Sequence, residues 1–165
     1  GSNDILSKGQ IFRNSVSEEV ITKVKCTTLV VPENAKFKKI EEVTFPTDFS
    51  LSNNLQILEP ISKISEKNNA MLSILNIGKK PPILNADQQK NKELLEDYFY
   101  DRKHNFYFLT NKKVEDAVQC FVESRHVDLI AMVAKNLNYF KQILFHTKVE
   151  EISYHTDIPF LVLHE

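Results

Sequence analysis

The sequence predicts an α/β protein built on a doubly wound, five-stranded parallel sheet. From Lys39 onward, short apolar runs alternate with stretches in which apolar residues recur every three or four positions, a pattern typical of strands alternating with helices. The run Leu129–Val133 is apolar throughout, as expected for a strand covered on both faces. A third observation is that the sequence near the N-terminus resembles the sequence at the C-terminus. At 165 residues, with 42% hydrophobic and 26% charged, the chain has the composition of a globular domain.

The elements are expected in the order β-α-β-α-β-α-β-α-β, which favours right-handed crossovers and helices on both faces of the sheet. Asp48 or Ser50 would cap the first helix, and Pro60 predicts that this helix is kinked or starts late. The expected strands are Ile40–Phe45, Met71–Ile77, Phe106–Leu109, Leu129–Val133 and Phe160–Leu163. The expected helices are Leu51–Ile64, Asp87–Tyr100 (with Leu94, Leu95, Tyr98 and Phe99 buried), Val114–Val122 and Lys148–His155.

The N-terminal segment resembles the C-terminal one. Shifted by 132 positions, the 24 residues from Gln10 to Glu33 share 7 identities with the end of the chain, whereas unrelated sequence would give about one or two. Both copies carry a capping box, Ser15-x-x-Glu18 and Thr147-x-x-Glu150, and each box predicts the start of a helix. We therefore expect residues 1–35 to be the last helix and strand of one domain and residues 36–165 to be a complete second copy.

Glycine is scarce, and this excludes two classes of nucleotide site. Gly1, Gly9 and Gly78 are the three glycines of the chain. Phosphate-binding loops need glycine where the main chain approaches the ligand. Neither GxGxxG nor GxxxxGK[ST] occurs, so intact dinucleotide-binding and P-loop sites are excluded.

Charge and cysteine content give further exclusions. Lys and Arg number 21 against 22 Asp and Glu, so the cluster Lys36, Lys38 and Lys39 is interpreted as a solvated segment and no nucleic-acid partner is expected. Cys26 and Cys120 form no CxxC, and Cys120 is expected in the core. The longest apolar run is too short for a membrane span, and a cytoplasmic location is the default expectation.

Four segments resemble the universal stress protein family in their order and spacing. Val43–Ser50 (VTFPTDFS) is similar to the family's first strand and turn, and Asp128–Met132 is similar to its fourth strand. Ile158–Leu163 resembles its last strand, as does Cys26–Pro32 in the N-terminal segment. The resemblance implies strand order 3-2-1-4-5 and association as dimers or tandem pseudo-dimers. It also implies that Thr28–Val31 lies antiparallel beside Phe160–Leu163, within one chain or between two.

Some members of that family bind ATP, and the resemblance implies where such a site would lie. In those members the aspartate after the first strand contacts adenine, and Asp48 holds that position. A Gly-x2-Gly-x9-Gly-Ser/Thr segment after the fourth strand holds ribose and phosphates. Its four positions fall on Val133, Asn136, His146 and Thr147, so the hydroxyl position alone is retained. The loss of two charge-assisted donors would cost about 3–6 kcal/mol, or about 10²–10⁴ in affinity.

We therefore predict a degenerate nucleotide site with no resident cofactor. Its candidate residues are Pro46, Thr47, Asp48, Met132, Ala134, Asn136, His146 and Thr147. Two alternatives remain open. Asp48 has a structural alternative as a helix cap or turn residue. The side chains Lys135, Asn136, Lys141 and His146 could instead present donors to an anion near Thr147.

No convergent catalytic or metal-binding set stands out. The five histidines lack HxxxH or HExxH spacing, and neither cysteine has an evident activating partner. The favoured function is a non-enzymatic stress-response domain that acts through dimerisation and partner binding. The alternative is a ligand-sensing module that still binds ATP, AMP or another small anion, and an enzyme on the same sheet is a third.

Overall fold

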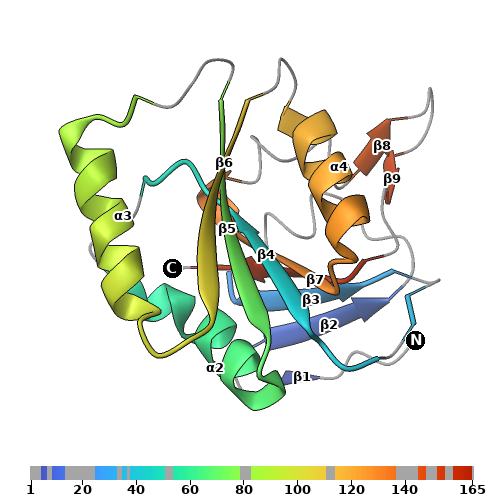
Figure 1. Ribbon diagram of the computed structural model, residues 1–165. Helices are drawn as coiled ribbons and strands as arrows, with labels where there is room; N and C mark the ends of the chain where they lie inside the picture. Colours follow the sequence, from blue (N-terminus) through green and yellow to red (C-terminus); the bar gives the residue numbers. More distant parts are fainter. Residues whose placement is uncertain are drawn as a thin grey trace.

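The protein forms one eight-stranded sheet with helices on both faces (Figure 1). Its strands, in spatial order, are β1 (Ile5–Leu6), β2 (Gly9–Arg13), β3 (Thr27–Val31), β10 (Phe160–Leu163), β7 (Leu129–Val133), β4 (Glu42–Pro46), β5 (Met71–Gly78) and β6 (His104–Thr110). The computed structural model describes residues 5–6, 9–13, 25–32, 35–36, 38–50, 54–78, 83–110, 114–136, 145–147, 152–154 and 158–164.

Five strands of this sheet confirm the predicted fold class. β6, β5, β4, β7 and β10 lie side by side in parallel, in the order 3-2-1-4-5 expected for residues 36–165. Every residue of β7 is buried, as its unbroken apolar run predicts. The sheet direction and order therefore follow from the alternation of strand and helix patterns in the sequence.

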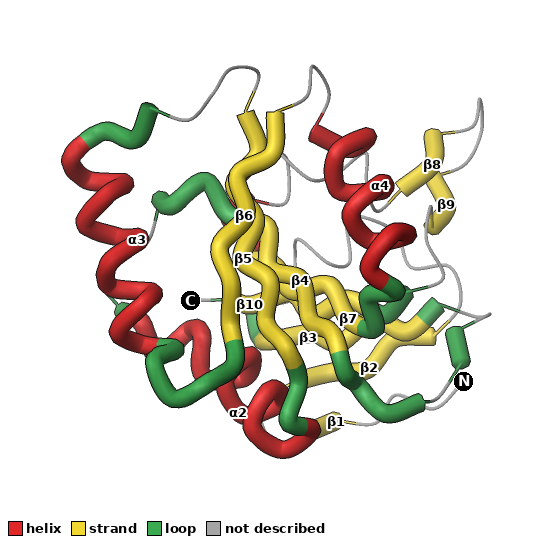
Figure 2. The backbone as a smooth tube through the Cα atoms, viewed as in Figure 1, coloured by secondary structure: helices red, strands yellow, loops and turns green. Residues whose placement is uncertain are grey.

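The helices divide between the two faces of the sheet (Figure 2). On one face, α2 (Glu59–Asn68) and α3 (Ala86–Tyr98) cover a core that includes Phe45, Ile61 and Phe99. On the other face, α4 (Val114–Arg125) packs its residues Val118 and Val122 onto a second core. This division is the one that right-handed crossovers impose when the strand order reverses. None of the described helices is long and apolar enough to cross a membrane.

The start of α2 differs from the prediction that Asp48 or Ser50 caps it. A short 3-10 helix, η1 (Leu55–Leu58), precedes α2, and the side chain of Asn54 caps η1 by accepting the N–H of Gln56 (3.0 Å). Pro60 lies in the first turn of α2, where its missing N–H costs nothing. The late start predicted from the proline is confirmed, and the cap lies further along the chain than expected.

The N-terminal segment joins the sheet through β3. β3 pairs antiparallel with β10, and Leu29 lies opposite Leu161. β2 continues the sheet parallel to β3. Val30 is fully buried in the same core as Val162, so β3 is part of the hydrophobic core and not an appended strand. The helix that Ser15-x-x-Glu18 predicts falls on residues 14–24, outside the described residues.

Three expectations about helical residues are wrong. Within the predicted helix Lys148–His155, the described residues form strand β9 (Ile152–Tyr154), which pairs antiparallel with β8 (Phe145–Thr147) in a separate small sheet. Aromatic and β-branched residues favour strands once they find a partner. Cys120 is exposed and Leu94 is 37% exposed. Cys120 is two residues past Val118, about 200° around the helix, and so points away from the core.

Candidate functional site

The candidate site lies where the two central strands of the sheet separate. β4 and β7 pair through Val43–Leu129 and Thr44–Ile130. The pairing of β4 with β5 continues further, to Pro46–Leu75. After β4 the chain adds β5 and then β6 on one side of β4, whereas β7 and then β10 lie on its other side. The strand order therefore reverses between β4 and β7, which makes this point the topological switch point. Open α/β sheets bind ligands at the carboxyl ends of the strands that meet there.

The turn after β4 is held by its own side chains. Thr47 is 3% exposed, and its Oγ1 accepts the N–H of Phe49 (3.1 Å). Asp48 is half-buried and its Oδ1 accepts the N–H of Ser50 (2.9 Å). Asp48 therefore acts in a turn, one of the two roles left open by the sequence. Its bonds to described residues are made through Oδ1, from the N–H and the hydroxyl of Ser50.

Phe49 adopts a strained backbone conformation in this turn. Its φ is 61°, in the left-handed region that aromatic residues rarely occupy, at a cost of about 1–3 kcal/mol. The turn is fastened from α3, because Gln88 Nε2 donates to the carbonyl of Asp48 (3.1 Å) and Asn91 Nδ2 donates to that of Phe49 (2.7 Å). The ring of Phe49 is buried, 6.2 Å from the rings of Phe106 and of Phe108. These hydrogen bonds and ring contacts together hold the turn in its strained conformation.

A groove of about 640 Å³ lies between this turn and the first half of α3. Its polar lining comes from Asp48, Ser50, Asn85, Asp87, Gln88, Lys90 and Asn91. The lining includes two carboxylates and one ammonium group, so the groove suits a hydrogen-bond donor better than an anion. The sequence analysis found Asp48 alone among these residues. The capping box in which Asn85 and Gln88 bond each other (2.8 and 3.0 Å) is the sequence signal that could have located the rest.

The other predicted residues divide between the sheet and the β8–β9 pair. Pro46 and Met132 are buried in strands, and Ala134 is partly buried. Asn136 ends the short 3-10 helix η2 (Ala134–Asn136), which follows β7 directly. His146 and Thr147 lie in β8, opposite Ser153 and Ile152 of β9. The structure thus brings the residues from β4 and β7 to one edge of the sheet and places the last two in a different sheet.

The opposite, amino-terminal edge of the sheet holds a buried carboxylate that the sequence analysis did not single out. Asp128 Oδ2 accepts the N–H groups of Glu41 and Glu42 (2.8 and 3.0 Å), and Oδ1 forms an ion pair with Lys38 (2.7 Å). Burial raises the pKa of Asp128, but the hydrogen bond and charge of Lys38 and the two N–H donors outweigh it, and the pKa is lowered. This group clamps β7 to β4 below the point where they separate.

Among the described residues, no group of three or more His, Cys, Asp or Glu side chains could hold a metal ion. The groove and the turn therefore offer amide, carboxylate and ammonium groups, which bind ligands by hydrogen bonds and charge.

Comparisons with known proteins give structural relatives. No protein-family model matches the sequence, and no curated protein matches it. A universal stress protein from Archaeoglobus fulgidus superposes with a TM-score of 0.60 at 12% identity, over 88% of this chain and 52% of that one. A protein of the universal stress protein family from Burkholderia pseudomallei gives a TM-score of 0.54 at 11% identity, over 79% of this chain and 100% of that one. The fold is that of the universal stress proteins.

The comparisons bear on the predicted resemblance and on the length of the chain. The resemblance seen in the strand and turn segments is confirmed at the level of the fold. The chain spans about half the length of the Archaeoglobus fulgidus protein, 52%, and the whole of the Burkholderia pseudomallei protein's length is covered.

Proposed function

We propose that this chain is a non-enzymatic domain of the universal stress type that acts through dimerisation and partner binding, with a degenerate nucleotide site. The proposal has two parts, and each has its own test. One concerns the loss of the phosphate-holding elements. The other concerns the pairing of β3 with β10.

The position of Thr147 carries the first part. A phosphate is held well where main-chain N–H groups converge at the start of a helix. Thr147 is the retained hydroxyl of the motif, yet it ends strand β8 and lies opposite Ile152 in an antiparallel pair. The three glycine positions carry Val133, Asn136 and His146. The absence of glycine at these three positions and the strand that ends at Thr147 both support the proposal that the phosphate-holding segment is degenerate.

Isothermal titration calorimetry with ATP, ADP and AMP tests this part. We expect any dissociation constant to be about 0.1 mM or weaker, because a loss of about 3–6 kcal/mol weakens a micromolar site by about 10²–10⁴. Asp48→Ala and the matched groove variant Asp87→Ala are titrated alongside. A micromolar dissociation constant that Asp48→Ala abolishes and Asp87→Ala leaves unchanged would overturn the proposal and favour a ligand-sensing role.

The antiparallel pairing of β3 with β10 supports the second part. A strand of four or five apolar residues left on an open edge invites association. Here β3 covers that edge of β10 with a strand of the same chain, and the repeated sequence makes the two strands equivalent. We infer that the pair is an internal version of the contact through which two such domains associate.

A disulfide trap tests this pairing in solution. Leu29 and Leu161 lie directly opposite each other, at a separation that suits a disulfide. In a background with Cys26→Ser and Cys120→Ser, the pair Leu29→Cys and Leu161→Cys should oxidise within one chain and stay monomeric on a non-reducing gel. The mismatched pair Leu29→Cys and Val162→Cys, whose side chains point to opposite faces, should stay reduced. Cross-linked dimers would show that the pairing forms between two chains.

A second candidate function rests on the groove beside Asp48. Its volume of about 640 Å³ is in the range of small-molecule sites, and its carboxylates and amides suit a neutral or cationic polar ligand. A ligand-sensing module would use this groove in place of the phosphate-holding segment. A ligand bound in the groove should lose affinity in both Asp48→Ala and Asp87→Ala, because both residues line the groove. A nucleotide bound at the motif should lose affinity in Asp48→Ala alone, because Asp87 is no part of that motif.

A further inference from the structure

The α3 wall of the groove beside Asp48 changes in chemistry along its length. The residues that α3 contributes recur about one helical turn apart, and they are Asp87, then Lys90 and Asn91, then Leu94. At 1.5 Å of rise per residue, Leu94 lies about 10 Å along the helix from Asp87. This wall therefore runs from a carboxylate, through an ammonium group and an amide, to an apolar side chain.

The opposite wall is the turn after β4, and two hydrogen bonds set its position along α3. Gln88 Nε2 donates to the carbonyl of Asp48 (3.1 Å), and Asn91 Nδ2 donates to that of Phe49 (2.7 Å). Asp48 therefore lies beside the first turn of α3, which is also the turn that carries Asp87. Both carboxylates line the same end of the groove.

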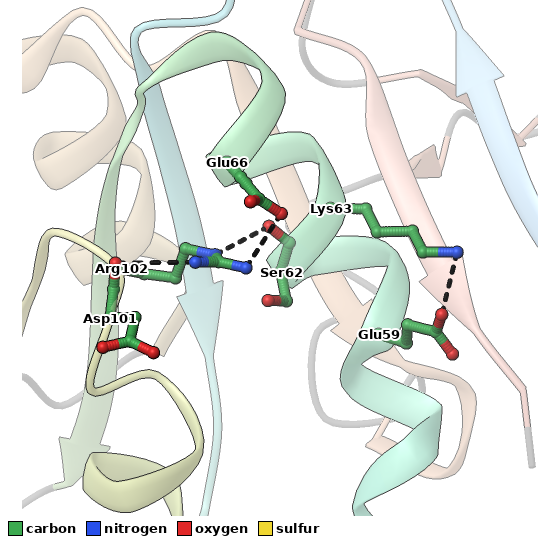
Figure 3. A network of polar contacts seen from close by, with 6 residues as sticks. All are labelled: Glu59, Ser62, Lys63, Glu66, Asp101 and Arg102. Atoms are coloured by element: carbon green, nitrogen blue, oxygen red, sulfur yellow. Dashed lines mark hydrogen bonds and ion pairs between the residues drawn. The ribbon is translucent and has the colours of Figure 1, made fainter.

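The charges around α2 are paired with one another (Figure 3). Lys63 forms an ion pair with Glu59 (2.8 Å). Arg102 forms an ion pair with Glu66 (3.0 Å). Both cations on this surface therefore already have a carboxylate partner.

The charges that α3 contributes to the groove differ in this respect. Further along the helix, Lys92 forms an ion pair with Glu96 (2.8 Å). The side chains of Asp87 and Lys90 form no hydrogen bond or ion pair with any other residue that the structure describes. The groove therefore brings together charges of both signs that the described part of the chain does not match.

Two leucines add an apolar part to the lining. Leu94 is 37% exposed, and Leu55 is half-buried. A ligand that covers such side chains removes apolar surface from water, which is favourable. The lining therefore suits a small molecule that carries a cation, an anion and an apolar group.

We propose that the groove binds an apolar α-amino acid in its zwitterionic form. The ammonium group of the amino acid is held by the carboxylates of Asp48 and Asp87. Its carboxylate bonds the ammonium group of Lys90, one helical turn from Asp87. Its side chain packs against Leu55 and Leu94.

This inference rests on the second candidate function, a ligand-sensing groove, and gives that groove a ligand class. A ligand with one charge leaves either the carboxylates or the ammonium group of the lining without a partner, whereas a zwitterion matches both. The test below uses no nucleotide and no residue of β3 or β10. Its result is therefore independent of the tests of nucleotide binding and of strand pairing.

NMR titration of the whole chain compares L-leucine with two analogues at pH 6.5. Leucinamide keeps the side chain and an ammonium group that is largely protonated at this pH, but lacks the carboxylate. The other analogue, 4-methylpentanoate, keeps the side chain and the carboxylate and lacks the ammonium group.

We expect L-leucine to shift the side-chain amide signals of Asn91, with a dissociation constant below about 1 mM for a ligand of this size. Each analogue should bind about three- to tenfold more weakly, the worth of one charged contact in a partly exposed groove.

Two neutral variants assign each charge of the ligand to its partner. Lys90→Gln should abolish the preference for L-leucine over leucinamide, because the carboxylate no longer meets a cation. Asp87→Asn should weaken L-leucine and leucinamide by a similar factor and leave 4-methylpentanoate unchanged. Asp97→Asn is the matched control, an exposed carboxylate of α3 outside the groove, and should change none of the three.

Four results would overturn the inference. They are a dissociation constant for L-leucine above about 1 mM, equal binding of L-leucine and leucinamide to the wild type, an unchanged preference in Lys90→Gln, and equal effects of Asp87→Asn and Asp97→Asn. Tighter binding of leucinamide than of L-leucine would also overturn it, but would leave the groove as a site for cations, so the second candidate function would stand. Absence of binding by all three ligands would count against both.

Discussion

Removal of the Asp128 carboxylate should destabilise the sheet more than its exposed ion pair would suggest. The Asp128 side chain is 7% exposed and its partner Lys38 is 61% exposed. The ion pair alone contributes little to stability, because water screens the exposed ammonium. The two hydrogen bonds from the N–H groups of Glu41 and Glu42 are the larger contribution, since Asp128→Ala leaves both donors without this acceptor.

The expected loss for Asp128→Ala is about 2–3 kcal/mol of unfolding free energy, from two donors at about 1–1.5 kcal/mol each in a partly exposed position. Lys38→Gln serves as the matched control and should lose much less unfolding free energy than Asp128→Ala. Urea unfolding at pH 7 measures both variants. Equal losses in the two variants, or a loss below about 0.5 kcal/mol for Asp128→Ala, would refute the view that the carboxylate clamps β4 to β7.

The same carboxylate gives an acid dependence whose sign is fixed. The pKa of Asp128 is lowered from its ordinary value of 3.8, so below that value the unfolded chain binds the proton more readily than the folded one. The stabilisation is complete above the unfolded value and is lost as pH falls through the lowered folded value. Asp128→Asn should flatten this part of the stability profile relative to the wild type.

Three further predictions concern other buried or strained positions. Thr44 is fully buried and its Oγ1 has no hydrogen-bond partner among the described residues, so Thr44→Val should raise the urea-unfolding free energy by about 1 kcal/mol; a loss would reveal a hidden partner. Burial raises the pKa of Glu42, the charge of Arg125 opposes this, and that of Asp128 adds to it. Stability should therefore fall as pH rises above 4.5, and Glu42→Gln should gain stability towards pH 7; a pH-independent difference in urea midpoints would contradict this. Asn91→Ala should release the strained turn and cost about 1–2 kcal/mol in thermal or urea unfolding; an unchanged midpoint would show that the bond does not hold the turn.

The sheet could be predicted from sequence because its signals are local and repeated. The apolar run Leu129–Val133 and the final run Phe160–Leu163 coincide with the observed strands β7 and β10. Burial on both faces selects long apolar residues at every position, so the pattern depends little on distant contacts. The late helix start at Pro60 was predictable for a similar reason, because proline acts on its own turn.

The β8–β9 pair could not be predicted in this way. Thr147-x-x-Glu150 is a good capping box, and local sequence alone favours a helix after it. The observed pairing of Phe145 with Tyr154 joins residues on the far sides of that box. Cross-strand contacts between aromatic residues form only when the chain folds, so a local sequence pattern that favours a helix does not reveal them. The structure therefore differs from the prediction in the segment to which the resemblance assigns the phosphate site.

The groove beside Asp48 escaped the sequence analysis for a different reason. Its lining combines a turn after β4 with amide side chains from α3, about 40 residues further along the chain. Asn and Gln on a helix surface are usually solvated, and a single sequence does not reveal that Gln88 and Asn91 reach a strained carbonyl. The position of β6 at the end of the described sheet was equally hidden, because the sequence shows an aromatic strand and not whether another strand covers it.

The two ends of the β4–β7 pair have different roles. The amino end stabilises the sheet, and the carboxyl end shapes the groove. At the amino end, Asp128 joins the strands through buried hydrogen bonds. At the carboxyl end, the pairing stops after Thr44–Ile130, and the strained turn at Phe49 takes over. A strained backbone conformation persists where the surrounding contacts hold it in place. The hydrogen bonds of Asp128 at the amino end therefore help the sheet to tolerate the strained turn at the carboxyl end. Substitutions at Asp128 should therefore lower stability with little change in the groove, whereas substitutions at Asn91 should alter the groove at a smaller cost in stability.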